Sequence, residues 1–260
     1  MKTVLYTGAR SGLSSYVINK LLKKDYLIYV TVHTEEEEKY IKKRYKNESK
    51  IICFKLDITS SEDLEKLKLL NIDVLVCNAA IGEGGSLVEM DVNRIRNNFE
   101  VNVFSTFRLI QIILRNMIKR KTGRVIVISS LASTIPLCFL GSYCGSKASL
   151  SMMTRILKKE VEKLNKKLDI ILIEPGLYHT GFNQVMLDNK YDKMSVDSFF
   201  KEQLEIIKRR ENMLFGLFEK KDYASIGNKI YRAIDSKYPR FIYRAPLLQS
   251  ITAKIYKFLT

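Results

Sequence analysis

Short β-rich runs alternate with helix-like runs along most of this 260-residue chain. Such alternation favours a parallel sheet with helices on both faces. We expect strands near residues 3–7, 27–32, 51–56, 74–77, 124–129 and 169–173, and helices near 14–24, 36–45, 61–70, 92–119 and 143–164. No linker-like or low-complexity segment interrupts the sequence, so we expect one α/β domain over residues 1–260.

The composition excludes several classes of protein. Hydrophobic residues make up 46% of the chain and charged residues 28%, as in soluble globular proteins. No apolar run approaches the roughly 18 residues of a membrane span. The first strand-like run is also too short for the apolar region of a signal peptide. We therefore expect a cytoplasmic protein.

Cysteine and histidine are too few and too scattered for a metal site, so we expect none. The four cysteines show no C-x-x-C spacing, and the only histidines are His33 and His179. Cys53 and Cys77 lie in strand-like runs, so we expect them to be buried thiols.

The net charge of +16 raises the question of an anionic partner. Basic residues are spread along most predicted helices without interleaved aromatic residues, which favours a solvated surface over a nucleic-acid site. Residues 237–260 differ, because they combine basic and apolar side chains and contain no acid. This pattern is typical of a basic amphipathic segment that makes weak peripheral contact with an anionic membrane. A C-terminal strand and helix docked on the core, or a subunit contact, is the alternative.

The first strand-like run leads into the turn Thr7-Gly8-Ala9-Arg10-Ser11-Gly12-Leu13-Ser14 and then into a helix. This is the context in which a dinucleotide pyrophosphate is bound, because glycines allow close backbone approach and the helix N-terminus supplies N–H groups. The spacing is G-x-x-x-G-x-S, so Ser14 stands where a third glycine would allow close helix packing. Ser14 could equally cap the helix.

A second pattern predicts a proton-transfer site. Tyr143 and Lys147 lie four residues apart on one predicted helix face, and Ser130 precedes Tyr143 by thirteen residues. A phenol has a pKa of about 10. We expect the Lys147 ammonium, together with the cationic ring of an oxidised nicotinamide, to lower that pKa. Ser130 rather than Ser129 should face Tyr143, since neighbouring strand residues point to opposite faces.

Taken in order, these motifs resemble those of the short-chain dehydrogenase/reductase family. The resemblance covers residues 3–180 well and the rest loosely, and it implies a single-domain Rossmann fold with a doubly wound parallel sheet. It also implies hydride transfer between a nicotinamide cofactor and a carbonyl or secondary alcohol. The residues that carry it are Gly8, Gly12, Asp57, Cys77-Asn78-Ala79-Ala80, Asn102, Ser130, Tyr143, Lys147 and Pro175-Gly176.

The resemblance implies catalytic roles for four residues. Tyr143 would be the general acid/base, and Ser130 would polarise the substrate carbonyl or hydroxyl. Lys147 would lower the tyrosine pKa and hold the nicotinamide ribose. Asn102, at the bend of its helix, would keep a water that joins Lys147 to solvent.

The resemblance also implies a set of cofactor contacts. Asp57 would meet the adenine, Asn78 the cofactor near the fourth strand, and Thr180 the nicotinamide amide. The full set is Gly8, Arg10, Ser11, Gly12, Leu13, His33, Asp57, Ile58, Asn78, Ala79, Tyr143, Lys147, Pro175, Gly176 and Thr180.

Departures from the family pattern leave a second function open. Ser14 replaces the third glycine, and Cys77 and Ala80 replace the first Asn and the Gly of the family's N-N-A-G. These are small, packing-type positions. The alternative to an enzyme is therefore a catalytically degenerate dinucleotide-binding protein or a membrane-associated sensor.

The choice of nicotinamide depends on the end of the second predicted strand. An acidic residue there would bind ribose hydroxyls, whereas a basic one would bind a 2′-phosphate. His33 falls where relatives that use NADP carry Arg, and Arg10 could reach the phosphate, while residues 35–38 are four glutamates that oppose it. This favours NADP(H), with NAD(H) as the alternative.

Two apolar segments, within residues 131–140 and 182–200, border the substrate in the family and favour a hydrophobic ketosteroid-, retinoid- or oxoacyl-like molecule. We expect residues 1–120 to bind mainly cofactor, 121–180 to hold the catalytic residues and 181–225 to form a substrate lid. The predicted helices 92–119 and 143–164 pair between subunits in relatives, so a homodimer or homotetramer is expected.

Overall fold

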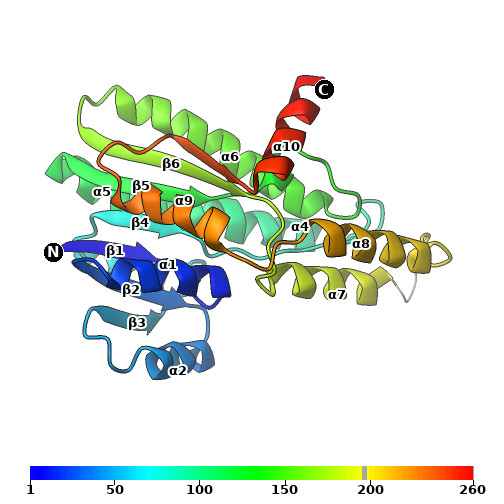
Figure 1. The fold of residues 1–260 in the computed structure, drawn as a ribbon, viewed down its shortest axis with the longest axis horizontal. Helices are drawn as coiled ribbons and strands as arrows, with labels where there is room; N and C mark the ends of the chain where they lie inside the picture. Colours follow the sequence, from blue (N-terminus) through cyan, green and yellow to red (C-terminus); the bar gives the residue numbers. More distant parts are fainter. Residues whose placement is uncertain (195–197, 260) are drawn as a thin grey trace.

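Seven parallel strands form one sheet in the order β3-β2-β1-β4-β5-β6-β7, as Figure 1 shows for a computed structural model that describes residues 1–194 and 198–259. The expected parallel sheet is thereby confirmed, and the strand order reverses between β1 and β4. The strands are β1 (Lys2–Tyr6), β2 (Tyr26–Val32), β3 (Ile51–Lys55), β4 (Val74–Cys77), β5 (Thr122–Ile128), β6 (Lys167–Pro175) and β7 (Ile242–Ala245).

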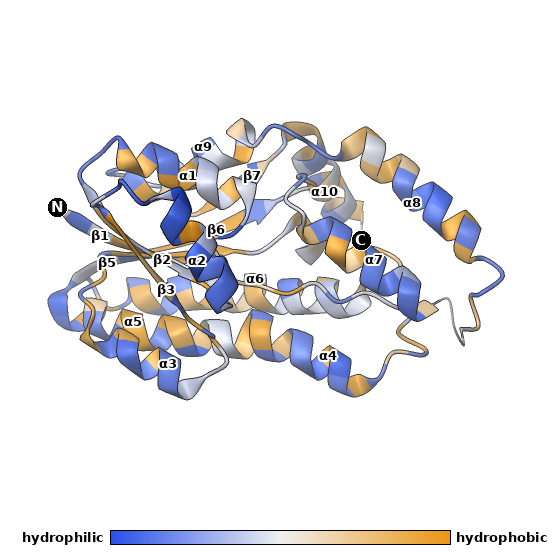
Figure 2. Cartoon of the chain, turned by 90° about the horizontal axis from the view of Figure 1, so that it is seen from below, coloured by the Kyte–Doolittle hydropathy of each residue, from blue (hydrophilic) through white to orange (hydrophobic). Residues whose placement is uncertain are grey.

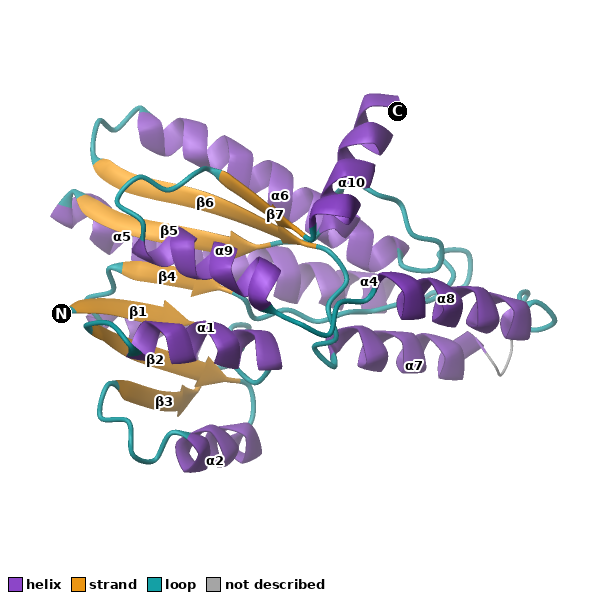
Figure 3. Cartoon of the chain, in the orientation of Figure 1, coloured by secondary structure: helices purple, strands orange, loops and turns teal. Residues whose placement is uncertain are grey.

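Helices cover both faces of the sheet (Figure 3). One face packs against α1 (Gly12–Leu22), α2 (Glu35–Arg44) and α9 (Ala224–Asp235). The other packs against α3 (Ser61–Lys66), α5 (Thr106–Arg120) and α6 (Gly141–Glu162). The strands alternate accordingly: Val4 and Tyr6 of β1 belong to the first core and Leu5 to the second. The central strands are buried on both faces over most of their length, as in β4, where all four residues are buried, which is why they read as apolar runs.

The predicted helix 92–119 is wrong as a single α-helix. The chain forms α4 (Val92–Phe99), then a π-helical segment (Glu100–Ser105), and then α5. Such insertions are frequent at functional sites. The π-helical segment contains Asn102, for which the sequence implied a helix bend.

Residues 181–259 extend the fold beyond the predicted elements. The helices α7 (Phe182–Met194) and α8 (Leu204–Phe218) lie side by side as an arm that projects past the sheet (Figure 1). The buried Lys190 of α7 is ion-paired with Glu211 of α8.

The C-terminal segment is a strand and helix: β7 pairs in parallel with β6, and α10 (Leu247–Leu259) follows. In the described ranges 1–194 and 198–259, no helix combines the length and apolarity that crossing a membrane requires.

Arg124 joins three elements. From β5 it pairs with its cross-strand neighbour Asp169 on β6, with 2.7 Å between Nη2 and Oδ2. Its Nη1 donates to the carbonyls of Ala233 and Ile234 at 2.8 and 2.7 Å, in the last turn of α9. The guanidinium therefore satisfies carbonyls that a helix end leaves unpaired and complements the negative end of the helix dipole.

We expect Arg124→Leu to lower the free energy of unfolding by about 2 kcal/mol or more, because charged hydrogen bonds each contribute about 1.5–3 kcal/mol. Urea unfolding followed by circular dichroism measures this. The exposed Arg115 of α5 gives a matched control, and Arg115→Leu should change stability by less than about 0.5 kcal/mol. Equal losses in both variants would show that Arg124 does not fasten α9.

Candidate active site

The carboxyl ends of β1, β4, β5 and β6 meet at one edge of the sheet, where a doubly wound fold binds its ligands. Each strand leads there into a segment that the sequence predicted for the site. The segments are residues 7–14, 78–80, 129–133 and 175–180.

The turn after β1 is tied to the loop after β4. Thr7 Oγ1 accepts from the N–H groups of Asn78 and Ala79 at 3.0 and 3.1 Å. In return, Asn78 Nδ2 donates to the carbonyls of Thr7 and Gly8 at 3.0 and 2.8 Å. Gly8 has a φ of +63°, and a Cβ on it would lie 2.7 Å from the Ala79 Cα. Both backbone conformation and space therefore require glycine at position 8.

Helix α1 begins at Gly12, and Ser11 is its N-cap. Ser11 Oγ accepts from the Ser14 N–H at 3.2 Å, and the Ser14 hydroxyl lies 2.9 Å from Ser11 Oγ. The alternative that Ser14 caps the helix is therefore wrong, because Ser11 fills that role. Ser14 is fully buried and bonded, so a serine is accommodated where the family has its third glycine. The N–H groups of the first turn, including those of Gly12 and Leu13, lack intrahelical acceptors and suit a phosphate.

Tyr223 covers the glycine turn from the other side. A Cβ on Gly12 would lie 2.8 Å from the Tyr223 ring, and the Tyr223 hydroxyl donates to the His179 carbonyl. This contact links the start of α1 to the loop after β6. Sequence reasoning missed Tyr223, because it lies outside every motif and reaches the turn only through the path of the chain after α8.

Glu37 contacts both residues that were predicted to bind the 2′-phosphate of NADP, Arg10 and His33. Its Oε1 accepts from Arg10 Nη1 at 3.0 Å, and its Oε2 accepts from the His33 backbone N–H at 3.0 Å. The Arg10 side chain is otherwise exposed. The structure thus brings Arg10 and His33 to one place, and a carboxylate lies between them.

Asp57 and Ile58 follow β3. The Asp57 carboxylate accepts from Thr59 N and Oγ1 at 2.8 and 2.7 Å, so it fixes a local turn. Ile58 is buried in the core between sheet and helices. Only 5% of Ile58 is exposed, so little of its side chain is open to a cofactor in this structure.

Tyr143 and Lys147 are both buried on α6. Lys147 Nζ lies 5.8 Å from the centre of the Tyr143 ring and donates to the Ile128 carbonyl at 3.3 Å. Burial raises the pKa of Tyr143 to about 12, and a hydrogen bond with Ser130 opposes this in part. Burial lowers the pKa of Lys147 to about 8. The expected lowering of the tyrosine pKa includes the charge of an oxidised nicotinamide and stays a prediction, whereas in the chain alone loss of solvent sets the direction of the shift.

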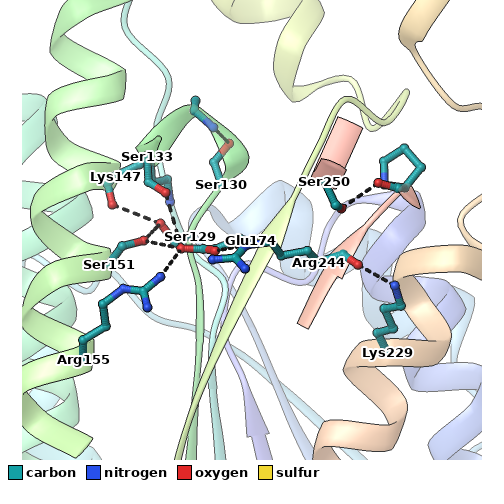
Figure 4. A network of polar contacts seen from close by, with 12 residues as sticks. Ser129, Ser130, Ser133, Lys147, Ser151, Arg155, Glu174, Lys229, Arg244 and Ser250 are labelled. Carbon is teal, nitrogen blue, oxygen red and sulfur yellow. Dashed lines mark hydrogen bonds and ion pairs between the residues drawn. The ribbon is translucent and has the colours of Figure 1, made fainter. Parts of the chain in front are cut away.

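Ser129 and Ser130 face different surroundings, as predicted from strand alternation. Ser130 is close enough to Tyr143 to lower its pKa in part, and its Oγ accepts from the Ala132 N–H at 3.1 Å. Ser129 Oγ instead donates to the Lys147 carbonyl at 3.1 Å and lies 2.8 Å from Ser151 Oγ. Figure 4 shows Ser129 inside a polar network with Glu174, and Ser130 outside it.

Asn102 is held by backbone and side-chain bonds. Its Oδ1 accepts from the Ile81 N–H at 2.9 Å, and its Nδ2 donates to the Ile81 carbonyl at 2.9 Å. Nδ2 also lies 3.0 Å from Ser146 Oγ, on the helix that carries Lys147. The structure therefore places Asn102 between the loop after β4 and α6. Its hydrogen bonds within the described residues go to these groups, not directly to Lys147.

The segment after β6 leads from the sheet into the arm. Gly176 N donates to the Ala245 carbonyl at 2.7 Å, which continues the pairing of Pro175 with β7. Thr180 is half-buried, and its N–H donates to the Tyr178 carbonyl at 2.8 Å. It immediately precedes Gly181, where φ is +81°, and the first turn of α7.

The start of α7 packs over Tyr143. The Phe182 ring centre lies 5.7 Å from that of Tyr143. An apolar cluster surrounds the two rings, and its other members are Ala132, Leu140, Cys144 and Met186. In the part of the chain that the structure describes, no group of three His, Cys, Asp or Glu side chains could hold a metal ion. The arrangement therefore places a buried phenol, a hydroxyl and an amine beside an apolar wall.

The fold and this site define an α/β dinucleotide-binding protein with a tyrosine–lysine–serine centre. The family model for short chain dehydrogenases matches residues 2–190. The chain belongs to the short-chain dehydrogenase/reductase family, whose members bind NAD(P).

Individual relatives cover most of the chain. A 3-oxoacyl-[acyl-carrier-protein] reductase of Buchnera aphidicola is 28% identical over 74% of this chain and 80% of its own. A 3-ketodihydrosphingosine reductase of Bacteroides thetaiotaomicron is 26% identical over 96% and 90%. The solved structure of an actinorhodin polyketide ketoreductase variant with NADPH has a TM-score of 0.78 at 20% identity, covering 94% of this chain and 95% of that one. At this low identity, the likeness to the ketoreductase structure shows a shared fold.

The depressed pKa of Lys147 predicts a pH-dependent stability difference. Between about pH 8 and the ordinary value of 10.5, the unfolded chain binds more protons at this site than the folded chain. The contribution of Lys147 to stability therefore improves as the pH rises through that window. Lys147→Met should be more stable than the parent near pH 7, by up to about 3 kcal/mol, and the difference should shrink toward pH 10.

Urea unfolding of both proteins at pH 7 and pH 10 measures this. A constant cost, such as the lost hydrogen bond to the Ile128 carbonyl, cancels in the comparison between the two pH values. Lys159→Met, at an exposed position of the same helix, should show no such pH dependence. A Lys147→Met difference that is equal at both pH values contradicts the buried, low-pKa amine.

Proposed function

We propose that this protein is an NADP(H)-dependent oxidoreductase that interconverts a ketone and a secondary alcohol on a hydrophobic, amphiphilic molecule. The observation that carries the proposal is the buried Tyr143 phenol, close to Ser130 and enclosed by apolar side chains at the ligand edge of the sheet. A ketone that reached this phenol would meet a proton donor in an environment that excludes water.

The bound nicotinamide would supply or accept the hydride. Tyr143, whose pKa of about 12 keeps it protonated at neutral pH, is the proton donor to the carbonyl oxygen. Ser130 donates a second hydrogen bond to that oxygen and so stabilises the charge that develops on it. The protonated phenol suits reduction of a ketone, and the oxidation direction needs the phenolate.

Lys147 and Asn102 support the proton donor. The buried Lys147 amine holds the cofactor ribose and places a positive charge near the phenol, which offsets charge left on its oxygen after proton transfer. Asn102 keeps the water through which that proton is replaced. Its hydrogen bonds to both backbone groups of Ile81 and to Ser146 fix the amide for this purpose.

The substrate class follows from the wall around Tyr143. Phe182 and Met186 of α7 and Leu140 before α6 offer no hydrogen bond to a polar substrate. The relative that reduces 3-ketodihydrosphingosine, judged by its name, matches almost the whole of both chains, including residues beyond 190. We therefore propose a 3-oxo group on a long alkyl or acyl chain, and residues 181–225 as the lid that closes over it, of which residues 195–197 lie outside the described part of the chain.

Cofactor choice rests on Arg10, His33 and Glu37. The first two can receive the 2′-phosphate of NADP, whereas the Glu37 carboxylate between them opposes it and can accept from ribose hydroxyls. NADP(H) is the proposed cofactor, and Glu37 limits the preference over NAD(H). A cytoplasmic location stays a prediction.

A homo-oligomer is part of the proposal. Phe104 in the π-helical segment is half exposed, as are Met152 and Ile156 on α6. A surface cavity of about 640 Å³ is lined by Phe104 and by residues 95–100 at the end of α4. These are the helices through which relatives pair, and the exposed apolar side chains suit a partner copy.

Tyr143→Phe should lower turnover of a 3-oxo thioester with NADPH by about 10²- to 10⁴-fold, because general acid catalysis is lost. NADPH binding, measured by fluorescence titration, should persist. Tyr40→Phe, at an exposed position of α2, is the control and should leave turnover unchanged. Near-normal turnover of Tyr143→Phe would refute the acid/base role. A parent protein that binds NADPH without oxidising it across a broad carbonyl panel would instead support the degenerate binding protein.

Glu37→Gln should lower the KM for NADPH about fivefold, since removing a charge beside Arg10 is worth about 1 kcal/mol. The KM for NADH should stay the same or rise. Steady-state kinetics with both cofactors and one ketone measure this, and Glu35→Gln at the same helix opening is the control. Parallel changes for both cofactors would show that Glu37 acts on the fold of the turn and not on the 2′-phosphate.

A further inference from the structure

The helix α10 exposes the face that its sequence would be expected to bury. Its packed face buries only the small residues Ser250 and Ala253. The opposite face is an apolar stripe at helical spacing, and Phe258 on it is 89% exposed. The helix projects away from the body beside the sheet edge (Figure 1), and hydrophobic residues recur along it (Figure 2). The stripe consists of Leu247, Leu248, Ile251, Ile255, Phe258 and Leu259.

Two basic residues of α10 lie toward its packed side. Lys254 and Lys257 lie on the side of α10 that faces β7 and α6, where a cavity of about 230 Å³ is also lined by Arg155 and Arg244. Glu174 is the carboxylate at these cations, and it is bound by both arginines at 3.1 and 2.6 Å. Neither lysine forms an ion pair with any residue in the ranges 1–194 and 198–259. Four cations against one buried carboxylate leave the cavity with an excess of positive charge.

The apolar stripe begins next to the loop after β6, which borders the candidate active site. Gln249, in the first turn of α10, accepts from the Leu177 N–H at 2.8 Å and donates to the Phe218 carbonyl at 2.7 Å. It therefore connects α10 both to the loop after β6 and to the end of the arm. The exposed side chains of Leu217 and Phe218 lie at that end.

We infer that α10 is a docking surface for an anionic phospholipid bilayer. The apolar stripe enters the interface between headgroups and acyl chains, and the cavity with Lys254 and Lys257 receives a headgroup phosphate. Charge selects this occupant, because residues 237–259 contain no acid. A second copy placed on the stripe would bring its own lysines toward the same cations. Docking would also bring the ligand edge of the sheet close to the bilayer surface, where an amphiphilic substrate lies. Only this consequence rests on the proposed function.

Co-sedimentation with vesicles tests the inference on the full chain. Vesicles of phosphatidylglycerol and phosphatidylcholine should bind the protein, and pure phosphatidylcholine vesicles should bind it at least about tenfold less. Ile255→Ser with Phe258→Ser should abolish binding. Lys254→Glu with Lys257→Glu should lower it at least about tenfold, and raised salt should lower it for the parent. Because all four positions are exposed, folding should be unaffected, and circular dichroism checks this.

Matched controls lie elsewhere on the surface. Leu69→Ser removes a side chain that is 88% exposed, and Lys39→Glu with Lys43→Glu reverses two charges on α2. Neither should weaken sedimentation by more than about twofold. All variants should keep the parent's turnover of a short, water-soluble ketone, so sedimentation and catalysis fail independently.

Three results would overturn the inference. The first is equal sedimentation of the parent and the α10 variants. The second is a concentration-dependent dimer that the Ile255→Ser and Phe258→Ser pair dissolves, which would assign the stripe to a second copy. The third is binding of inorganic phosphate at the cavity, seen by calorimetry, in a protein that ignores the vesicles.

Discussion

The backbone contact between Gly8 and Ala79 is the constraint on which the rest of this site depends. It closes the gap between the first and fourth strands, where the sheet reverses its order and a doubly wound fold opens toward ligand. Thr7 and Asn78 lock the two segments together through four hydrogen bonds. A side chain at position 8 would force these segments apart, and the start of α1 would move with them.

Burial shapes the chemistry more than the spacing of the residues does. Tyr143 and Lys147 are neighbours on α6, yet each has its pKa moved toward the neutral form, because both have left water. A neutral phenol and a weakly basic amine form a site that can hold a ketone and give up a proton. Lys147, with a pKa of about 8, still carries a positive charge at neutral pH, and an oxidised nicotinamide would add to it under the proposed function.

The sequence predicts what local pattern determines. The strands and most helices fell within a few residues of the expected ranges, and strand alternation correctly separated Ser130 from Ser129. Sequence patterns could not predict the Glu37 bridge to Arg10 or the ring of Tyr223 over Gly12, because these contacts join residues that are 27 and 211 positions apart. The π-helical segment was also not predicted, since the apolar periodicity of residues 92–119 runs through it without a break. The raised pKa of Tyr143 in the chain alone was not predicted for a related reason: burial depends on the packing of the whole domain.

Glu174 shows how distant parts of this structure share one group. Its Oε1 lies 3.2 Å from Ser151 Oγ, which lies 2.8 Å from Ser129 Oγ, and Ser129 donates to the Lys147 carbonyl (Figure 4). The same carboxylate binds Arg155 and Arg244, the two arginines of the cavity beside α10. An anion that drew either arginine toward itself would weaken its hold on Glu174. The hydrogen bonds of Ser151 and Ser129 would then change, so the cavity beside α10 and the backbone of Lys147 are connected through one buried carboxylate.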